Sequence, residues 1–212
     1  MASGTNWIER LRTFPGLVHA DALDWCRGRS WLVRAPLFVY CIYIGLRMLW
    51  DPHYWTLLHS LNLPIHEAGH PLFSWFGPFL GAAGGTILQF AAPLGSMIMF
   101  FRQRDYFAIC FCFAWLATNC YHTGVYMADA TELVLPLVTI GGGDAQHDWL
   151  YLFGKLRVLR QAKLIGWLTC QAGLLCMLAC WTGSVYLFWR MHRASGRNAR
   201  AKSGASFNTR SS

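Results

Sequence analysis

The sequence predicts an all-α protein, a small polytopic membrane bundle of about five helices, with four to six segments that span or re-enter the bilayer. The composition is the first indication, because 55% of the 212 residues are apolar and only 13% are charged, against about a quarter charged in a soluble domain. Three long uncharged runs are the second, at residues 80–101, 106–127 and 165–189. Each reaches the roughly 20 residues that a membrane-spanning helix needs.

The first part of the chain predicts an arm followed by two weaker membrane segments. Residues 1–34 carry scattered charges and no continuous apolar run, which favours a short amphipathic arm over a cleaved signal peptide. Residues 35–50 are apolar but short, and Arg47 lies near their end, where its long side chain can reach the interface. Residues 55–79 are apolar but contain three histidines and Glu67.

The last part of the chain predicts an interfacial helix, a final membrane span and a tail. Residues 150–164 alternate apolar and basic side chains, a pattern that suits a helix lying in the interface. Residues 190–212 are basic and polar, so we expect a disordered cytoplasmic tail near anionic lipid. The membrane domain is therefore expected to extend over residues 35–189, between the arm and the tail.

The net charge of +8 is interpreted as membrane orientation. Basic residues flank the apolar runs, as the positive-inside rule describes, and no DNA- or RNA-recognition motif is visible. We therefore expect the lipid bilayer as a partner and no nucleic acid. The basic clusters cannot all lie on one side if every run is a simple span, so one segment is expected to be re-entrant or interfacial. Seven of the eight cysteines lie in apolar runs, which predicts buried thiols.

The sequence His66-Glu67-Ala68-Gly69-His70 is an HExxH motif. On a helix, residues four apart share one face, so the two imidazoles can bind one ion and Glu67 can reach a water molecule beside it. Zn²⁺ suits two imidazoles and an open coordination position, and Glu67 is then the expected catalytic base. The alternative is a pair of interfacial histidines with Glu67 as a local hydrogen-bond partner.

The third metal ligand stays open, chiefly between three residues, with Asp144, His122 or a water molecule as the remaining possibilities. Asp148 is the first choice, because it follows a glycine-rich stretch and begins an amphipathic segment; otherwise it is a helix N-cap. His147 and Asp129 are the alternatives. Asp129 shares a helical face with Asn119 and His122.

Two further features each have two interpretations. Asn119 and His122 either donate hydrogen bonds to the oxyanion of a reacting peptide or form helix-to-helix hydrogen bonds. The glycine-rich stretch at residues 81–85 either allows close helix packing or forms an irregular edge that pairs with an extended substrate.

The HEAGH sequence at the start of an apolar segment resembles the zinc motif of site-2-protease-like intramembrane metallopeptidases. The resemblance implies Zn²⁺ held by His66 and His70, an aspartate ligand from a later segment, and residues 81–85 as the family's glycine-rich stretch. The chain is also similar to small bacterial membrane proteins with HEAGH and a later His-Asp-Trp, here residues 147–149, which implies the bacterial inner membrane.

The chain departs from the family pattern in two respects. It has no Asp-Gly pair, and Pro71 directly follows the motif. Because Pro64 also lies just before the motif, we expect His66 in the first turn of a short helix.

The expected function is a zinc metallopeptidase that hydrolyses peptide bonds of membrane proteins or membrane-near peptides. The alternative is a non-catalytic metal-binding membrane protein, such as a sensor or an assembly partner, which would keep His66 and His70 but would not need Glu67 as a base. A membrane scaffold without metal is the third possibility.

Overall fold

The computed structural model describes residues 7–51, 53–135 and 147–208, and these residues form helices and connecting turns without a strand. The all-α class predicted from the sequence is therefore confirmed. The elements in chain order are α1 (Trp7–Trp25), α2 (Ala35–Trp50), α3 (Leu57–Ser74), α4 (Pro78–Arg102), α5 (Tyr106–Asp129), α6 (Asp148–Leu156), the 3-10 turn η1 (Leu159–Gln161) and α7 (Ala162–Asn208).

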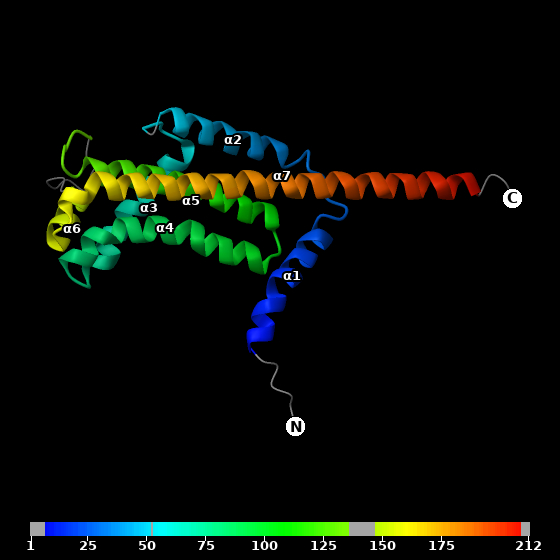
Figure 1. Ribbon diagram of the computed structural model, residues 1–212, viewed down its shortest axis with the longest axis horizontal. Helices are drawn as coiled ribbons and strands as arrows, with labels where there is room; N and C mark the ends of the chain where they lie inside the picture. Colours follow the sequence, from blue (N-terminus) through cyan, green and yellow to red (C-terminus); the bar gives the residue numbers. More distant parts are fainter. Residues whose placement is uncertain (1–6, 52, 136–146, 209–212) are drawn as a thin grey trace, which may run out of the picture.

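The longest helix, α7, runs the length of the molecule, with α5 beside it, α2 on one side and α3 and α4 on the other (Figure 1). The helix α1 leaves this bundle at an angle. It is not detached, because Arg104 and Tyr106 both bond to Asp21 of α1 and Trp25 is buried. The N-terminal arm expected from the sequence therefore contains a helix that is docked where α4 and α5 are joined.

The local sequence sets the helix starts. Thr56 caps α3 by accepting a hydrogen bond from the backbone N–H of His59, and Asp105 caps α5 in the same way. Because α3 already begins at Leu57, it includes both Pro64 and Pro71. The expectation that His66 lies in the first turn of a short helix was wrong.

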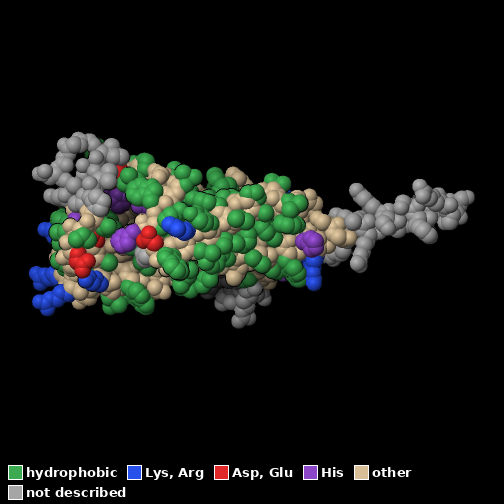
Figure 2. Space-filling model, turned by 90° about the horizontal axis from the view of Figure 1, so that it is seen from above, with side chains coloured by type: hydrophobic (Ala, Val, Ile, Leu, Met, Phe, Trp, Pro, Cys, Tyr) green, Lys and Arg blue, Asp and Glu red, His purple; other side chains and the backbone are tan. Residues whose placement is uncertain are grey.

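Two helices of the described chain are long and apolar enough to cross a membrane: α4 and the stretch Leu159–Gly196. Only 22% of the most apolar window of each is buried inside the molecule, so the other side chains of these windows are partly or fully exposed at its surface. Apolar side chains cover most of the central part of the face in Figure 2. These features fit membrane association, whereas the number of about five membrane segments stays a prediction.

Glycines allow two pairs of helices to approach closely. A Cβ at Gly69 of α3 would collide with the backbone of Gly84 in α4, and a Cβ at Gly124 of α5 would lie 2.6 Å from the carbonyl oxygen of Gly166 in α7. Residues 81–85 lie inside α4, so their backbone groups belong to the helix. Of the two interpretations of this stretch, close helix packing is the one that the structure shows.

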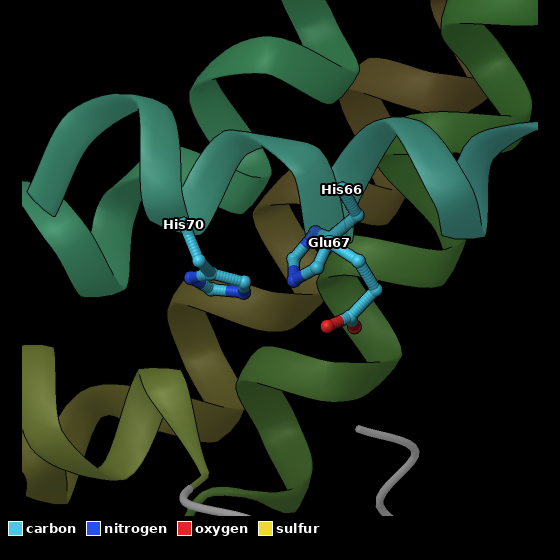
Figure 3. Close-up of side chains that lie close together, drawn as sticks. All are labelled: His66, Glu67 and His70. Atoms are coloured by element: carbon cyan, nitrogen blue, oxygen red, sulfur yellow. The ribbon is translucent and has the colours of Figure 1, made fainter. Parts of the chain in front are cut away.

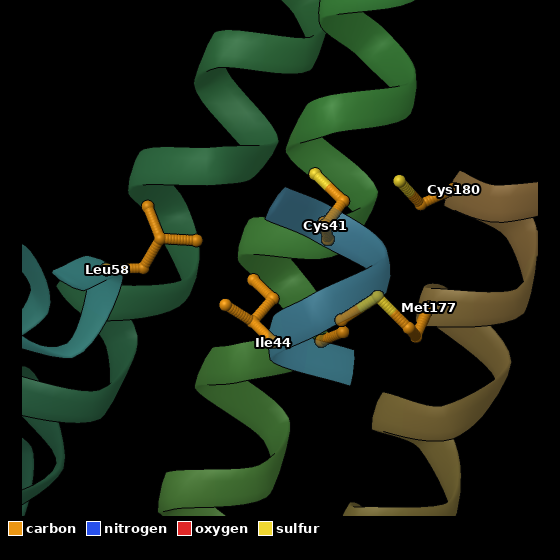
Figure 4. Packing of buried hydrophobic residues seen from close by; sticks show 7 residues of the cluster. Cys41, Ile44, Leu58, Met177 and Cys180 are labelled. Carbon is orange, nitrogen blue, oxygen red and sulfur yellow. The ribbon is translucent and has the colours of Figure 1, made fainter. Parts of the chain in front are cut away.

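An apolar core joins four helices in the middle of the bundle. Its buried members are small or flexible side chains from α2, α3, α5 and α7 (Figure 4), and partly buried aromatic side chains such as Trp115 and Trp181 pack against them. All eight cysteines of the chain are free thiols and six are buried, where they pack as small hydrophobes. The cluster consists of Cys41, Ile44, Leu58, Ala114, Ala117, Met177 and Cys180.

The region after the last loop differs from the expected pattern. The segment expected as one interfacial helix, residues 150–164, is interrupted. The helix α6 ends at Leu156, its C-cap residue Arg157 has a left-handed φ of 58°, and α7 begins at Ala162. The helix α7 then continues to Asn208, through most of the expected disordered tail. Alanine, arginine and lysine recur there, and these residues favour helix propagation.

Candidate metal centre

His66, Glu67 and His70 project from the same side of α3 (Figure 3). Each offers a ligand atom, and these atoms lie within 4.8 Å of one another. The arrangement follows from the motif, because residues four apart meet on one helical face. All three side chains are half-buried. The group could hold a metal ion, and the rest of the site shows how its nitrogens are oriented.

Each imidazole is turned by a hydrogen bond at its Nδ1 atom. His66 Nδ1 lies 2.9 Å from the side-chain oxygen of Gln89, and His70 Nδ1 lies 2.9 Å from the backbone oxygen of Gly81. Carbonyl oxygens only accept, so each Nδ1 carries a proton, and each Nε2 is the ring nitrogen that faces Asp148. A hydrogen bond at the ring nitrogen that does not bind the metal is typical of metal-binding histidines, because it fixes the tautomer and the ring orientation.

Asp148 meets both free nitrogens from another part of the chain. Its Oδ2 atom lies 3.2 Å from His66 Nε2 and 3.5 Å from His70 Nε2. Donors bound tetrahedrally at about 2.0–2.1 Å from zinc are separated by about 3.3 Å, so the two distances from Asp148 Oδ2 are of the size expected between ligands of one ion. Asp148 is the first residue of α6, and its backbone N–H donates to the hydroxyl of Tyr126.

Two carboxylates thus approach the histidines, in different ways. The Asp148 oxygen is within hydrogen-bond distance of both Nε2 atoms. The Glu67 carboxylate is placed less closely, because it lies within 4.8 Å of the ligand atoms of His66 and His70. A ligand must contact the ion directly, while a general base acts on a water beside it. We therefore treat Asp148 as the candidate third ligand and Glu67 as the candidate base.

The two alternative ligands, His147 and Asp129, contact each other. His147 Nε2 lies 3.4 Å from Asp129 Oδ2, and both side chains are buried. Burial lowers the pKa of His147, against the opposing effect of the Asp129 carboxylate, which favours a neutral imidazole. His147 Nδ1 accepts the N–H of Leu150 and so caps α6. The N-cap of this helix is thus His147, and Asp148 is its neighbour.

Asn119 and His122 also make contacts between helices. The Asn119 side chain donates to the backbone oxygen of Gln89 at 2.6 Å and accepts from the Gln89 side chain at 3.3 Å. His122 contacts His59 through their Nδ1 atoms, and its Nε2 lies 3.4 Å from the backbone oxygen of Tyr54. The contacts with Gln89 and His59 join helices, and the contact with Tyr54 joins α5 to the segment before α3. The oxyanion role for these two residues stays a prediction.

Two residues that shape the site were not foreseen. Gln89 orients His66 and is itself oriented by Asn119; its only signal was a lone amide in the uncharged run of residues 80–101. Gly85 provides the space for the His66 ring, because a Cβ there would lie 2.6 Å from His66 Nε2. No sequence signal separates Gly85 from the neighbouring glycines.

A pocket of about 400 Å³ opens beside the candidate ligands. It lies where α3, the start of α4 and α6 meet, and it has two of the candidate ligands on its wall. Apart from His70 and Asp148 the lining is uncharged, and most of it is small. The lining residues are His70, Pro71, Ser74, Pro78, Gly81, Ala82, Asp148 and Tyr151.

Comparison of the chain with protein-family models, with curated proteins and with solved structures gives no match in any of the three. The function is therefore argued from the chemistry of the residues.

Proposed function

We propose that this protein is a membrane-embedded zinc metallopeptidase that hydrolyses peptide bonds of membrane proteins or membrane-near peptides. The observation that carries the proposal is the convergence of His66 Nε2, His70 Nε2 and Asp148 Oδ2 at 3.2 and 3.5 Å. Three protein ligands with a fourth position open are the typical set of a catalytic zinc site.

The donor set fits zinc by its chemistry. Two neutral imidazoles and one carboxylate are ligands that Zn²⁺ accepts at a tetrahedral site, and the hydrogen bonds at Nδ1 leave both Nε2 atoms to face the ion. When bound, zinc supplies a Lewis acid that polarises a carbonyl and lowers the pKa of water. His66, His70 and Asp148 would hold it.

Glu67 has the position of a general base in this scheme. It follows His66 directly in the motif, and its carboxylate lies within 4.8 Å of the histidine nitrogens. At that distance it can accept a proton from the attacking water and return it to the leaving amine. The role requires the carboxylate, so an amide of the same shape cannot replace it.

The surroundings support a peptide substrate close to the membrane. The pocket beside His70 and Asp148 offers space next to the proposed metal position, and α4, which supplies Gly81 and Gln89 to the site, is one of the two helices long enough to cross a membrane. A substrate that lies in or near the bilayer would thus meet the site from the side of α4.

Replacing Glu67 by glutamine tests the catalytic part of the proposal. The purified full chain is placed in proteoliposomes with a library of single-span peptides, and new peptide N-termini are counted by mass spectrometry. We expect Glu67→Gln to lower cleavage by about 10²- to 10⁴-fold while zinc content stays at one equivalent. Glu132→Gln is the matched control, because Glu132 is exposed and pairs with Lys163.

The outcomes separate the proposed peptidase from the alternatives. His66→Ala should lose both zinc and cleavage. Unchanged cleavage by Glu67→Gln would contradict the proposal. Zinc binding without cleavage in the unaltered protein would favour a non-catalytic metal-binding role, and absence of zinc would contradict both.

A further inference from the structure

Asp129, the last residue of α5, holds the chain on both sides of residues 136–146. Its carboxylate accepts the backbone N–H of Val134 at 3.0 Å and of Leu135 at 3.2 Å, just before this stretch. The same carboxylate lies 3.4 Å from Nε2 of His147, just after it, which is within ion-pair distance but without hydrogen-bond geometry. Asp129 is only 6% exposed, and a carboxylate buried to this degree needs partners for its oxygens. One side chain therefore joins the end of α5 to the start of α6.

His147 connects Asp129 to α6, because it contacts the carboxylate and also caps the helix. It is 5% exposed, and its Nδ1 accepts the backbone N–H of Leu150 at 3.3 Å. An imidazole is not among the preferred N-cap side chains, which are serine, threonine, aspartate and asparagine. A shorter side chain at this position would cap the helix but would not reach Asp129. Histidine serves both contacts because its two ring nitrogens point in different directions.

Tyr126 completes the support from α5. Its ring lies 4.2 Å from the His147 ring between centroids, and its hydroxyl accepts the backbone N–H of Asp148 at 3.1 Å. Residues of α5 thus contact both the cap residue and the first residue of α6. The backbone of Asp148 is held directly by Tyr126, and the residue before it, His147, packs against the same tyrosine ring.

The helix that carries Asp148 needs such support. With nine residues, α6 is shorter than the roughly 12–15 residues at which an isolated helix becomes even marginally stable. Asp148 also lies 82 residues after His66 in the sequence, so no local geometry brings the two together. The position of its carboxylate depends on contacts outside α6.

We propose that Asp129 and His147 are positioning residues that place Asp148 Oδ2 against His66 and His70. The inference rests on the metal site of the proposed function, but it does not require peptidase activity. It differs from a ligand role, because these two side chains meet each other while Asp148 meets the histidines. Their removal should weaken the metal site without removing a ligand.

The test measures Zn²⁺ affinity of the full chain in detergent by chelator competition, together with the visible absorption of the Co²⁺-substituted protein. We expect Asp129→Ala to lower Zn²⁺ affinity by about 10- to 100-fold, as loss of an outer partner does in other sites, and to change the Co²⁺ spectrum. One equivalent of zinc should still bind at saturation. Asp129→Asn keeps the shape and an acceptor oxygen, so we expect a smaller loss.

A second variant separates the cap from the contact with Asp129. His147→Asn retains a good N-cap side chain but is too short to contact Asp129, so we expect reduced Zn²⁺ affinity with α6 still capped. The matched control is Asp105→Ala, which removes a capping carboxylate from the other end of α5. It should lower the thermal stability and leave the Zn²⁺ affinity and the Co²⁺ spectrum unchanged.

Three results would overturn the inference. The first is Asp129→Ala behaving like Asp105→Ala, with lower stability but unchanged affinity and spectrum. The second is a stoichiometry of two zinc ions that falls to one in Asp129→Asn, which would make Asp129 a ligand. The third, no zinc binding by the unaltered protein, would also overturn the proposed function, whereas the first two leave that function standing.

Discussion

The pairs α3/α4 and α5/α7 are both packed through glycine, with different results. In α3/α4, Gly69 lies against the backbone of Gly84, and in α5/α7, Gly124 lies against the backbone of Gly166. Small residues let helix backbones approach closely in both. The two pairs lie within one bundle (Figure 1), so the same packing device can be compared in two places.

The two pairs differ in which side chains occupy the space beside the glycine contact. Next to the α3/α4 contact, Gly85 leaves room for the His66 ring, and the carbonyl of Gly81 accepts a hydrogen bond from His70 Nδ1. Next to the α5/α7 contact, the space is filled by Cys170 and Ala128. Close glycine packing thus makes a polar recess where a helix presents histidines, and a closed core where it presents small apolar side chains.

Of the substitutions that test this difference, Gln89→Leu in α4 is expected to have the largest effect, on Zn²⁺ affinity. Leucine of similar size removes the acceptor for His66 Nδ1–H, so the imidazole loses its orientation and tautomer preference. We expect Zn²⁺ affinity to fall by about 10- to 100-fold, measured by chelator competition. Gln103→Leu is the control, because Gln103 is exposed at the end of the same helix. If Gln89→Leu binds Zn²⁺ as tightly as the unaltered protein does, Gln89 does not orient a metal ligand.

Gly124→Ala tests the other pair and should act on stability alone. The added Cβ would lie 2.6 Å from both Cys170 Sγ and the Gly166 carbonyl oxygen, so backbone must shift. We expect the free energy of unfolding to fall by about 1–3 kcal/mol, measured by denaturant titration in detergent, with unchanged Zn²⁺ affinity. Gly196→Ala, in open space on α7, should cause no loss. A drop in Zn²⁺ affinity of Gly124→Ala would mean that the two pairs are coupled.

Gly85→Ala should show the smallest and most selective effect. Its Cβ would lie 2.6 Å from His66 Nε2, and the imidazole can turn away at little cost to packing. We therefore expect about a tenfold loss of Zn²⁺ affinity, at the low end for a perturbed metal ligand, with nearly unchanged thermal stability. Gly95→Ala, on the same helix with no atom within 4 Å, is the control. Loss of stability without loss of Zn²⁺ affinity would show that the α3/α4 pair stabilises the core and does not shape the metal site.

The predictable part of the site is the part that lies within one helix. His66, Glu67 and His70 share a face of α3 because of their spacing alone, and the structure places them together. Asn119 and Asp129 were expected on one polar face of a helix, and both are buried on α5. Their partners were not predictable, because each partner comes from another element.

Helix ends were less predictable than helix existence. The stretches expected as helices at residues 80–101 and 106–127 correspond to α4 and α5. The position of His66 within α3 was missed, because the cap at Thr56 starts that helix well before Pro64. The capping threonine thus sets the start of α3, and the helix accommodates Pro64 although a proline lacks the N–H donor and its ring crowds the preceding turn.

The amino-acid sequence alone established an all-α chain, its apolar segments and two histidines with a glutamate on one helical face, because periodicity and spacing are local properties of the chain. The tertiary structure alone decided that Asp148 approaches both histidines, that Gln89 and Gly81 orient them, and that Asp129 pairs with His147. These contacts join α3, α4, α5 and α6. They depend on how helices pack, which a spacing rule within one helix does not contain.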